Sequence, residues 1–122
     1  MTIMVVDDEE DVESLFKQKF RKEIKQGKIN FHFALSAEAA LQFLQNHEAS
    51  VVLILSDINM PGMNGLELLK IIKERFSHLK VFMITAYGDE QNYKIAMAYK
   101  ADDYITKPVN FEILKEKILN LT

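Results

Sequence analysis

Residues 51–57 of this chain, Val51-Val52-Leu53-Ile54-Leu55-Ser56-Asp57, carry the strongest fold signal in the sequence. The first five residues are apolar and mostly branched, a pattern typical of a strand that is buried on both faces. Strands of this kind belong to parallel sheets whose two faces are covered by helices. The run ends in Ser56 and Asp57, so a carboxylate stands directly at the end of a buried strand.

Short apolar runs of the same kind lie on both sides of this strand in the sequence, each followed by a longer segment with helical periodicity. The expected strands are residues 3–6, 29–35, 51–57, 81–84 and 104–106. The first helix is expected to run unbroken through residues 12–24 and to close at Gly27, and the fourth to span residues 89–100. Ser36 is an expected N-cap, as is Asn64, which would form a capping box with Glu67.

Five successive βα units favour one particular architecture. Because each crossover must be right-handed, the strands form a parallel sheet with helices on both of its faces. We therefore expect an α/β fold with a doubly wound, five-stranded parallel sheet, the flavodoxin-like (βα)5 arrangement with strand order 2-1-3-4-5, in a single domain over residues 1–122.

Composition excludes several classes of function. The chain has 122 residues and no cysteine, which excludes disulfides, thiolate metal sites and cysteine nucleophiles. The formal charge of −3 argues against direct nucleic-acid binding by this domain. The apolar run at residues 51–55 is too short to span a membrane, and residues 1–6 lack the features of a signal peptide. We expect a soluble, cytoplasmic domain that does not interact with membranes.

Polar side chains stand at the carboxyl ends of four of the expected strands. They are Asp7 and Asp8, Asp57, Thr85 and Lys107. With strand order 2-1-3-4-5, the first and third strands flank the point where the strand order reverses, and ligands bind in such a crevice. We expect these five side chains to converge there.

Each of these residues also has a simpler explanation when it is taken alone. An acid after a strand is often only a helix cap, and Asp8 is expected to cap the first helix. Thr85 alone could be a loop hydroxyl, and Lys107 alone a solvated charge. Asp57 is harder to explain in this way, because an idle charge at the end of a buried strand is costly.

The expected group of side chains indicates phosphoryl chemistry. Three neighbouring carboxylates repel one another and favour a hard divalent cation with oxygen ligands, for which Mg²⁺ is the best fit. Zinc is not expected, since the chain has no cysteine and His32, His47 and His78 are scattered. An aspartate beside Mg²⁺ and an ammonium group can attack phosphorus and become an acyl phosphate. Thr85 could then move toward the new phosphoryl oxygens, and Tyr104 could fill the space that it leaves.

From residue 3 to residue 121 the chain resembles the receiver domain of two-component response regulators. The resemblance is carried by Val5-Val6-Asp7-Asp8-Glu9, by Leu55-Ser56-Asp57-Ile58-Asn59-Met60-Pro61-Gly62-Met63-Asn64-Gly65, by Ile84-Thr85-Ala86 and by Ala101-Asp102-Asp103-Tyr104-Ile105-Thr106-Lys107-Pro108. It implies a phosphorylation switch in signal transduction, which is not a multiple-turnover enzyme and catalyses only its own phosphorylation and dephosphorylation.

The resemblance also implies a role for each residue of the site. Asp57 would accept the phosphoryl group from a phosphohistidine on a sensor histidine kinase or a histidine phosphotransfer protein. Asp8 would be the main Mg²⁺ ligand, with Asp7 acting largely through water and Asn59 through its backbone carbonyl. Lys107 would contact the phosphoryl group and precede a cis bond to Pro108.

The output of the domain follows from the same resemblance. Thr85 and Tyr104 would be the switch pair, and the side chains of Asn59 and Tyr87 would tune the lifetime of the phosphoryl group. A downstream partner or effector domain would bind the face of the fourth helix, fifth strand and fifth helix, and a phosphorylation-dependent homodimer is a further expectation. Lys100 stands where the family usually has glycine, and lysine there would extend the fourth helix or shift its last turn.

Several alternatives remain open at this point. A pseudo-receiver would use the same fold as a constitutive binding module. A magnesium-dependent aspartyl-phosphate hydrolase would need a general acid near its nucleophile, but the residue two beyond Asp57 is Asn59. A flavin carrier would need a hydroxyl-rich loop after the first strand. The basic residues of the first helix form either a solvated face or a place where sensor proteins dock; they are Lys17, Lys19, Arg21, Lys22 and Lys25.

Overall fold

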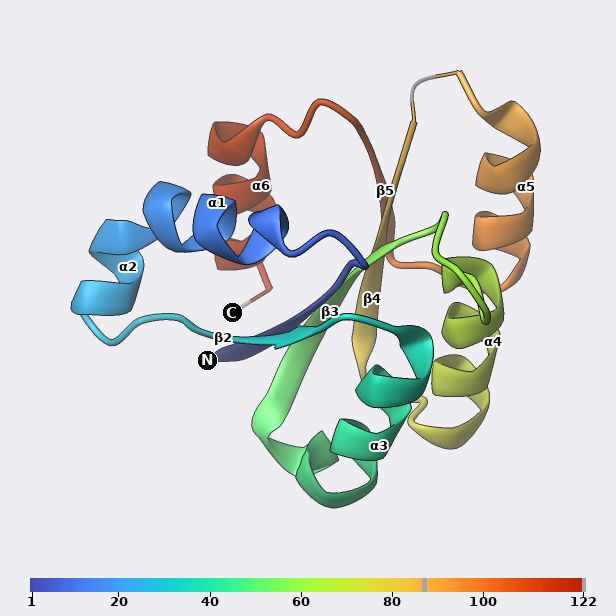
Figure 1. Ribbon diagram of the computed structural model, residues 1–122, viewed down its shortest axis with the longest axis horizontal. Helices are drawn as coiled ribbons and strands as arrows, with labels where there is room; N and C mark the ends of the chain where they lie inside the picture. Colours follow the sequence, from blue (N-terminus) through green and yellow to red (C-terminus); the bar gives the residue numbers. More distant parts are fainter. Residues whose placement is uncertain (87, 122) are drawn as a thin grey trace.

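The computed structural model describes residues 1–86 and 88–121 and has a five-stranded parallel sheet at its centre (Figure 1). The strand order is β2-β1-β3-β4-β5, which confirms the doubly wound topology. The strands are β1 (Thr2–Val6), β2 (Asn30–Ala34), β3 (Val51–Asp57), β4 (Lys80–Thr85) and β5 (Asp103–Thr106). The helices are α1 (Asp11–Lys19), α2 (Arg21–Lys25), α3 (Ala37–His47), α4 (Gly65–Arg75), α5 (Glu90–Ala98) and α6 (Phe111–Leu119), with a 3-10 turn at Glu48–Ser50.

Helices cover both faces of the sheet and enclose two apolar cores. The helices α1, α2 and α6 lie on one side, and α3, α4 and α5 lie on the other (Figure 1). Successive side chains of β3 serve both cores, because Leu53 and Leu55 pack on the first side and Ile54 on the second. All three are fully buried, and each such side chain contributes about 1.5–3 kcal/mol to folding.

Val52 departs from the prediction that the whole apolar run is buried, since 41% of its surface is exposed. The pairing between β1 and β3 shifts at this point, so that Thr2 faces Val51 whereas Ile3 faces Leu53. Val52 is therefore the extra residue of a bulge, and its side chain is pushed out of the regular alternation.

The expected first helix is divided in two, contrary to the prediction of one helix over residues 12–24. The chain leaves helical geometry at Phe20, with φ −106° and ψ 20°, and resumes as α2. The fully buried Phe20 ring packs against Phe16, Phe31 and Phe111, with centroids 5.9, 5.0 and 6.1 Å away. This packing accompanies the change of direction, although the apolar periodicity continues across the break.

The predicted caps of α3 and α4 are confirmed. Ser36 Oγ accepts a hydrogen bond from the backbone N–H of Ala39 at 3.1 Å. Asn64 and Glu67 form the expected capping box at the start of α4. Both caps satisfy backbone donors that a helix N-terminus otherwise leaves without partners.

Lys100 does not extend α5, which ends at Ala98. Lys100 takes the left-handed conformation itself, with φ 69°. The N–H of Lys100 donates to Met97 and the N–H of Ala101 donates to Ala96, the two bonds of a Schellman motif. Lysine thus adopts the backbone conformation that favours glycine, and the helix terminates there.

In the part of the chain that the structure describes, no helix is both long enough and apolar enough to cross a membrane.

Candidate functional site

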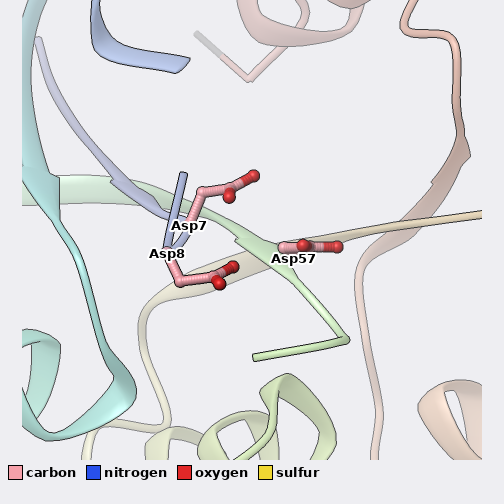
Figure 2. A group of neighbouring side chains, drawn as sticks. All are labelled: Asp7, Asp8 and Asp57. Atoms are coloured by element: carbon pink, nitrogen blue, oxygen red, sulfur yellow. The ribbon is translucent and has the colours of Figure 1, made fainter. Parts of the chain in front are cut away.

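Three carboxylates meet at the carboxyl edge of the sheet, at the point where the strand order reverses. Asp7 and Asp8 follow β1, and Asp57 is the last residue of β3. Each offers one oxygen, and these oxygens lie within 4.8 Å of one another. Figure 2 shows the three carboxylates projecting toward the same side of the backbone. The predicted convergence of the acidic residues is present in the structure.

Asp8 does not cap the first helix, contrary to expectation. The N-cap of α1 is Glu10, which makes no capping hydrogen bond with its side chain. Asp7 instead forms the local turn, because its Oδ1 accepts the backbone N–H of Glu9 at 3.0 Å. Since α1 starts only at Asp11, the exposed Asp8 carboxylate is left free to face Asp57 (Figure 2).

The environment of Asp7 disfavours its charge. Burial raises the pKa of the Asp7 carboxyl above its ordinary value of 3.8, and the charges of Asp57 and Glu9 raise it further. The hydrogen bond from Glu9 and the charge of Lys107 act in the opposite direction on this pKa. A cation bound among the carboxylates would relieve this electrostatic cost.

Asp57 is the most deeply buried member of the cluster, with 5% of its surface exposed. Its Oδ1 accepts the backbone N–H of Ile58 at 2.9 Å and lies 3.3 Å from Nζ of Lys107. The expected cis bond between Lys107 and Pro108 is present, and the N–H of Lys107 donates to the Thr85 carbonyl at 2.7 Å. Lys107 is therefore fixed to the end of β4 and reaches Asp57 from there.

Thr85 and Tyr104 lie on the neighbouring strands β4 and β5. The Thr85 hydroxyl is fully buried and makes no hydrogen bond of standard geometry with a described residue, although it lies near enough to the Tyr104 hydroxyl to interact with it. The Tyr104 hydroxyl donates to the backbone carbonyl of Asp89 at 3.2 Å, and its ring meets Tyr93 edge-on. Burial raises the pKa of Tyr104, the nearby Thr85 hydroxyl opposes this rise, and the charge of Asp89 adds to it.

The loop from β3 to α4 packs tightly against the backbone of Asp57. A Cβ on Gly65 would collide with the Asp57 carbonyl oxygen, Cα of Ile58 and the Asp57 carbonyl carbon. The N–H of Gly65 also donates to the Ile58 carbonyl at 2.8 Å. This close approach requires glycine and fixes the path of the chain on either side of Asn59, which is exposed.

Some contacts around the site had no signal in the sequence. Glu38, in the first turn of α3, accepts the backbone N–H of Met63 at 3.4 Å and so links α3 to the loop after β3. The carbonyl of Asp89 receives the Tyr104 hydroxyl. Both contacts join segments that are distant in sequence, and neither creates a residue pattern. Tyr87, for which a tuning role was expected, lies outside the described residues.

An apolar hollow of about 610 Å³ opens beside the acidic cluster. Asp7, Glu9 and Lys107 stand at its border. The rest of its lining is apolar and comes from α1, the end of β4 and the residue after it, and the segment that leads into the first residue of α6; these residues are Val12, Leu15, Phe16, Ile84, Ala86, Pro108, Val109 and Phe111. The charged site is thus continuous with a surface that can receive apolar side chains.

Fold and site together define a doubly wound α/β domain with a cluster of three carboxylates and a lysine at the point where the strand order reverses. The sequence model of one protein family, the response regulator receiver domain, matches residues 3–119. The chain therefore belongs to the response regulator receiver domain family of two-component systems. Receiver domains accept phosphoryl groups, bind Mg²⁺ at an acidic pocket and interact with histidine kinases and effector domains.

Individual relatives agree with this assignment. The chain is 33% identical to the chemotaxis protein CheY of Pseudomonas aeruginosa, covering 97% of this chain and 93% of that protein. It is 32% identical to a cyclic di-GMP phosphodiesterase of Thermotoga maritima, covering 97% of this chain but only 30% of that protein. A receiver domain protein of Clostridium thermocellum has a TM-score of 0.87 and 28% identity, covering 98% and 92% of the two chains.

Proposed function

We propose that this domain is a magnesium-dependent phosphorylation switch in which Asp57 is the phosphoacceptor. The observation that carries the proposal is the position of Asp57, buried at the end of β3 between two further carboxylates and the Lys107 ammonium. Burying a carboxylate beside two others costs free energy that one hydrogen bond and one ammonium only partly offset, and this cost favours a functional role for Asp57.

In the proposed reaction, an oxygen of Asp57 attacks the phosphorus atom of a phosphohistidine on a sensor histidine kinase or histidine phosphotransfer protein. A P–O bond forms and the P–N bond breaks, so the imidazole leaves and Asp57 becomes an acyl phosphate. Lys107 stabilises the charge on the transferring oxygens, since its ammonium lies 3.3 Å from the acceptor carboxylate. Attack by water later returns the aspartate and inorganic phosphate.

The donor set fits Mg²⁺, which takes carboxylate, carbonyl and water oxygens. Asp8 and Asp57 would hold it directly, Asp7 through water, and Asn59 through its backbone carbonyl. The cation would supply neutralising charge beside the phosphoryl oxygens. The cation would also offset the cost of charge at Asp7, whose pKa is raised by burial and by its acidic neighbours.

The switch would begin at Thr85. Its buried hydroxyl makes no hydrogen bond of standard geometry with a described residue and interacts only with the Tyr104 side chain, so it is available to donate to a phosphoryl oxygen on Asp57. That movement would change the packing beside Tyr104, which belongs to the adjacent strand. Because α1 is broken, the expected output face of the fourth helix, fifth strand and fifth helix corresponds to α5, β5 and α6 here. We propose this face for the downstream partner or a phosphorylation-dependent homodimer.

The apolar hollow beside the site supports a protein donor. It joins the charged residues to exposed apolar surface such as Leu15, which is 41% exposed. A partner that places a phosphohistidine at Asp57 could pack apolar side chains into this hollow.

The proposal is tested by intact-protein mass after incubation with Mg²⁺ and phosphoramidate, whose P–N bond imitates the proposed donor. We expect one added phosphoryl group on the wild type, and none on Asp57→Asn or after chelation of Mg²⁺. If the wild type gains no adduct and also fails to bind beryllofluoride, the constitutive binding module is the better interpretation.

A further inference from the structure

A second charged region lies away from the acidic site, on α1, α2 and the turn that follows them. Residues 17–28 contain six basic side chains and one acidic side chain, Glu23, in a chain whose net charge is −3. The basic residues are Lys17, Lys19, Arg21, Lys22, Lys25 and Lys28. We call them the α1–α2 basic patch.

The fold leaves most of this positive charge without compensation. Glu23 is turned inward, where it pairs with Lys115 of α6 at 3.5 Å and is only about one-fifth exposed. Lys17 pairs with Glu13 at 2.7 Å. Within the described part of the chain, the other five members of the patch have no carboxylate within ion-pair distance. The one acid that could neutralise α2 locally is therefore used to fasten it to α6.

Three residues of the patch line a hollow whose lining is partly apolar. This hollow has a volume of about 430 Å³, and Ile24 and Phe31 form the apolar part of its lining. Lys17, Arg21, Lys25 and Asn30 complete the lining. Figure 1 shows α2 beyond the end of α1, on the side of the molecule where β2 begins. The hollow is thus bordered by the end of α1, by α2 and by the first residues of β2.

The strand that borders this hollow is an edge of the sheet. β2 pairs with β1 on one side, and no strand among the described residues lies on the other. Asn30 donates to Met1 and Ala34 accepts from Asp7, so the backbone groups of both residues point toward β1. Because the direction alternates along a strand, the backbone groups of Phe31 and Phe33 point toward the free edge.

We propose that the α1–α2 basic patch and the free edge of β2 together dock an extended, acidic peptide segment of a partner protein. The segment would add a strand to β2 by bonding to the backbone of Phe31 and Phe33. Its carboxylates would meet Arg21 and Lys25, and one apolar side chain would enter the hollow over Ile24. A lipid headgroup or a nucleic-acid backbone offers anions but not the alternating donors and acceptors that a strand edge pairs with.

The probe for this test is a fluorescein-labelled peptide of about six alternating glutamate and valine residues, a typical strand length. It is titrated against the full chain at low salt, with fluorescence anisotropy as the readout. We expect saturable binding that Arg21→Glu with Lys25→Glu weakens roughly tenfold, since two attractive pairs become repulsive. The matched reversal Lys70→Glu with Lys94→Glu makes the same charge change on α4 and α5 and should leave the affinity unchanged.

Strand addition has a signature that charge attraction lacks. The amide protons of Phe31 and Phe33 should exchange more slowly with solvent when the peptide is bound. A peptide of the same charge with N-methylated backbone amides should bind at least tenfold more weakly, because it cannot donate to the edge. Arg21→Glu with Lys25→Glu should not alter phosphorylation at Asp57 by phosphoramidate, since neither residue lies in the acidic site.

Four results would overturn the proposal. The first is equal peptide affinity in the Arg21→Glu, Lys25→Glu variant, with its thermal unfolding unchanged. The second is equal affinity of the N-methylated peptide. The third is tighter binding of a single-stranded oligonucleotide of the same charge. The fourth is a dimer of the chain alone that the charge reversal dissolves, since a second copy would then occupy the surface.

Discussion

The ammonium group of Lys107 lies 3.3 Å from Oδ1 of Asp57. Asp57 ends β3 and Lys107 follows β5, and these two strands are not neighbours in the sheet. β4 lies between β3 and β5, and the backbone N–H of Lys107 is bonded to Thr85 at the end of β4. The relative positions of the Asp57 carboxylate and the Lys107 ammonium are thus set by the order of three strands. This arrangement places a fixed positive charge where a transferring phosphoryl group would develop negative charge.

Removing this ammonium should slow phosphorylation without removing the acceptor. For Lys107→Ala we expect the adduct to form roughly tenfold to a hundredfold more slowly, because one stabilising donor is lost. The rate is measured by intact-protein mass during incubation with phosphoramidate and Mg²⁺. Lys94→Ala, on the exposed surface of α5, is the matched control and should react at the wild-type rate. An unchanged rate in Lys107→Ala would exclude the proposed role of the lysine.

Asp7 should make the stability of the metal-free protein depend on pH. Its folded pKa lies above the ordinary value of 3.8, so its contribution to stability is fully present below pH 3.8 and is lost as pH rises through the folded pKa. In chelator, the free energy of unfolding of Asp7→Asn minus that of the wild type should therefore grow with pH over this interval. Urea unfolding at several pH values from about 3.5 to 7 measures the difference. A difference that stays constant with pH would show that the pKa of Asp7 is not raised in the folded protein.

Thr85 should matter for the switch and little for folding. Its hydroxyl is buried and makes no hydrogen bond of standard geometry with a described residue, so Thr85→Ala should change the free energy of unfolding by no more than about 1 kcal/mol. Beryllofluoride with Mg²⁺ should shift the Tyr104 ring resonances in the wild type and in Thr85→Ser, but not in Thr85→Ala. The fluorine signal of the bound ligand shows that each variant is loaded. If the Tyr104 resonances shift equally in Thr85→Ala with beryllofluoride bound, Tyr104 does not respond through Thr85.

Lys100, just after α5, allows a test of folding stability that does not involve the phosphorylation site. Lys100 holds φ 69°, a conformation that costs a side-chain-bearing residue about 1–2 kcal/mol and glycine almost nothing. Part of this gain is offset by the greater unfolded-state freedom of glycine. We expect Lys100→Gly to raise the free energy of unfolding by about 0.5–1 kcal/mol in urea titrations, and Lys100→Ala to give no such gain. Equal effects of the two substitutions would show that the backbone conformation is not the cause.

The features that followed from the sequence are those with a regular pattern. The buried run before Asp57 indicated a parallel sheet, and a parallel sheet brings the ends of its strands to one edge. The convergence of Asp7, Asp8 and Asp57 followed from that geometry. The cap at Asn64 followed from the spacing of one local motif.

Most of the features that escaped prediction depend on tertiary contacts, and one depends on a local turn. The break at Phe20 is hidden because the apolar period continues, and only the aromatic packing distinguishes it. The bulge at Val52 depends on how β1 pairs with β3. Asp8 resembles a helix cap in sequence, but the turn made by Asp7 delays the start of α1. The bond from Tyr104 to Asp89 joins residues that no pattern connects.

The proposed position of the phosphoryl group on Asp57 can be determined by chemical mapping. The protein is phosphorylated with phosphoramidate and Mg²⁺, treated with borohydride, which reduces an acyl phosphate to homoserine, and digested for peptide mass analysis. We expect homoserine at position 57 alone, and no homoserine when Mg²⁺ is chelated or when the phosphoramidate is left out. Reduction at Asp7 or Asp8 instead, or a phosphoryl group that persists on Asp57→Asn, would contradict it.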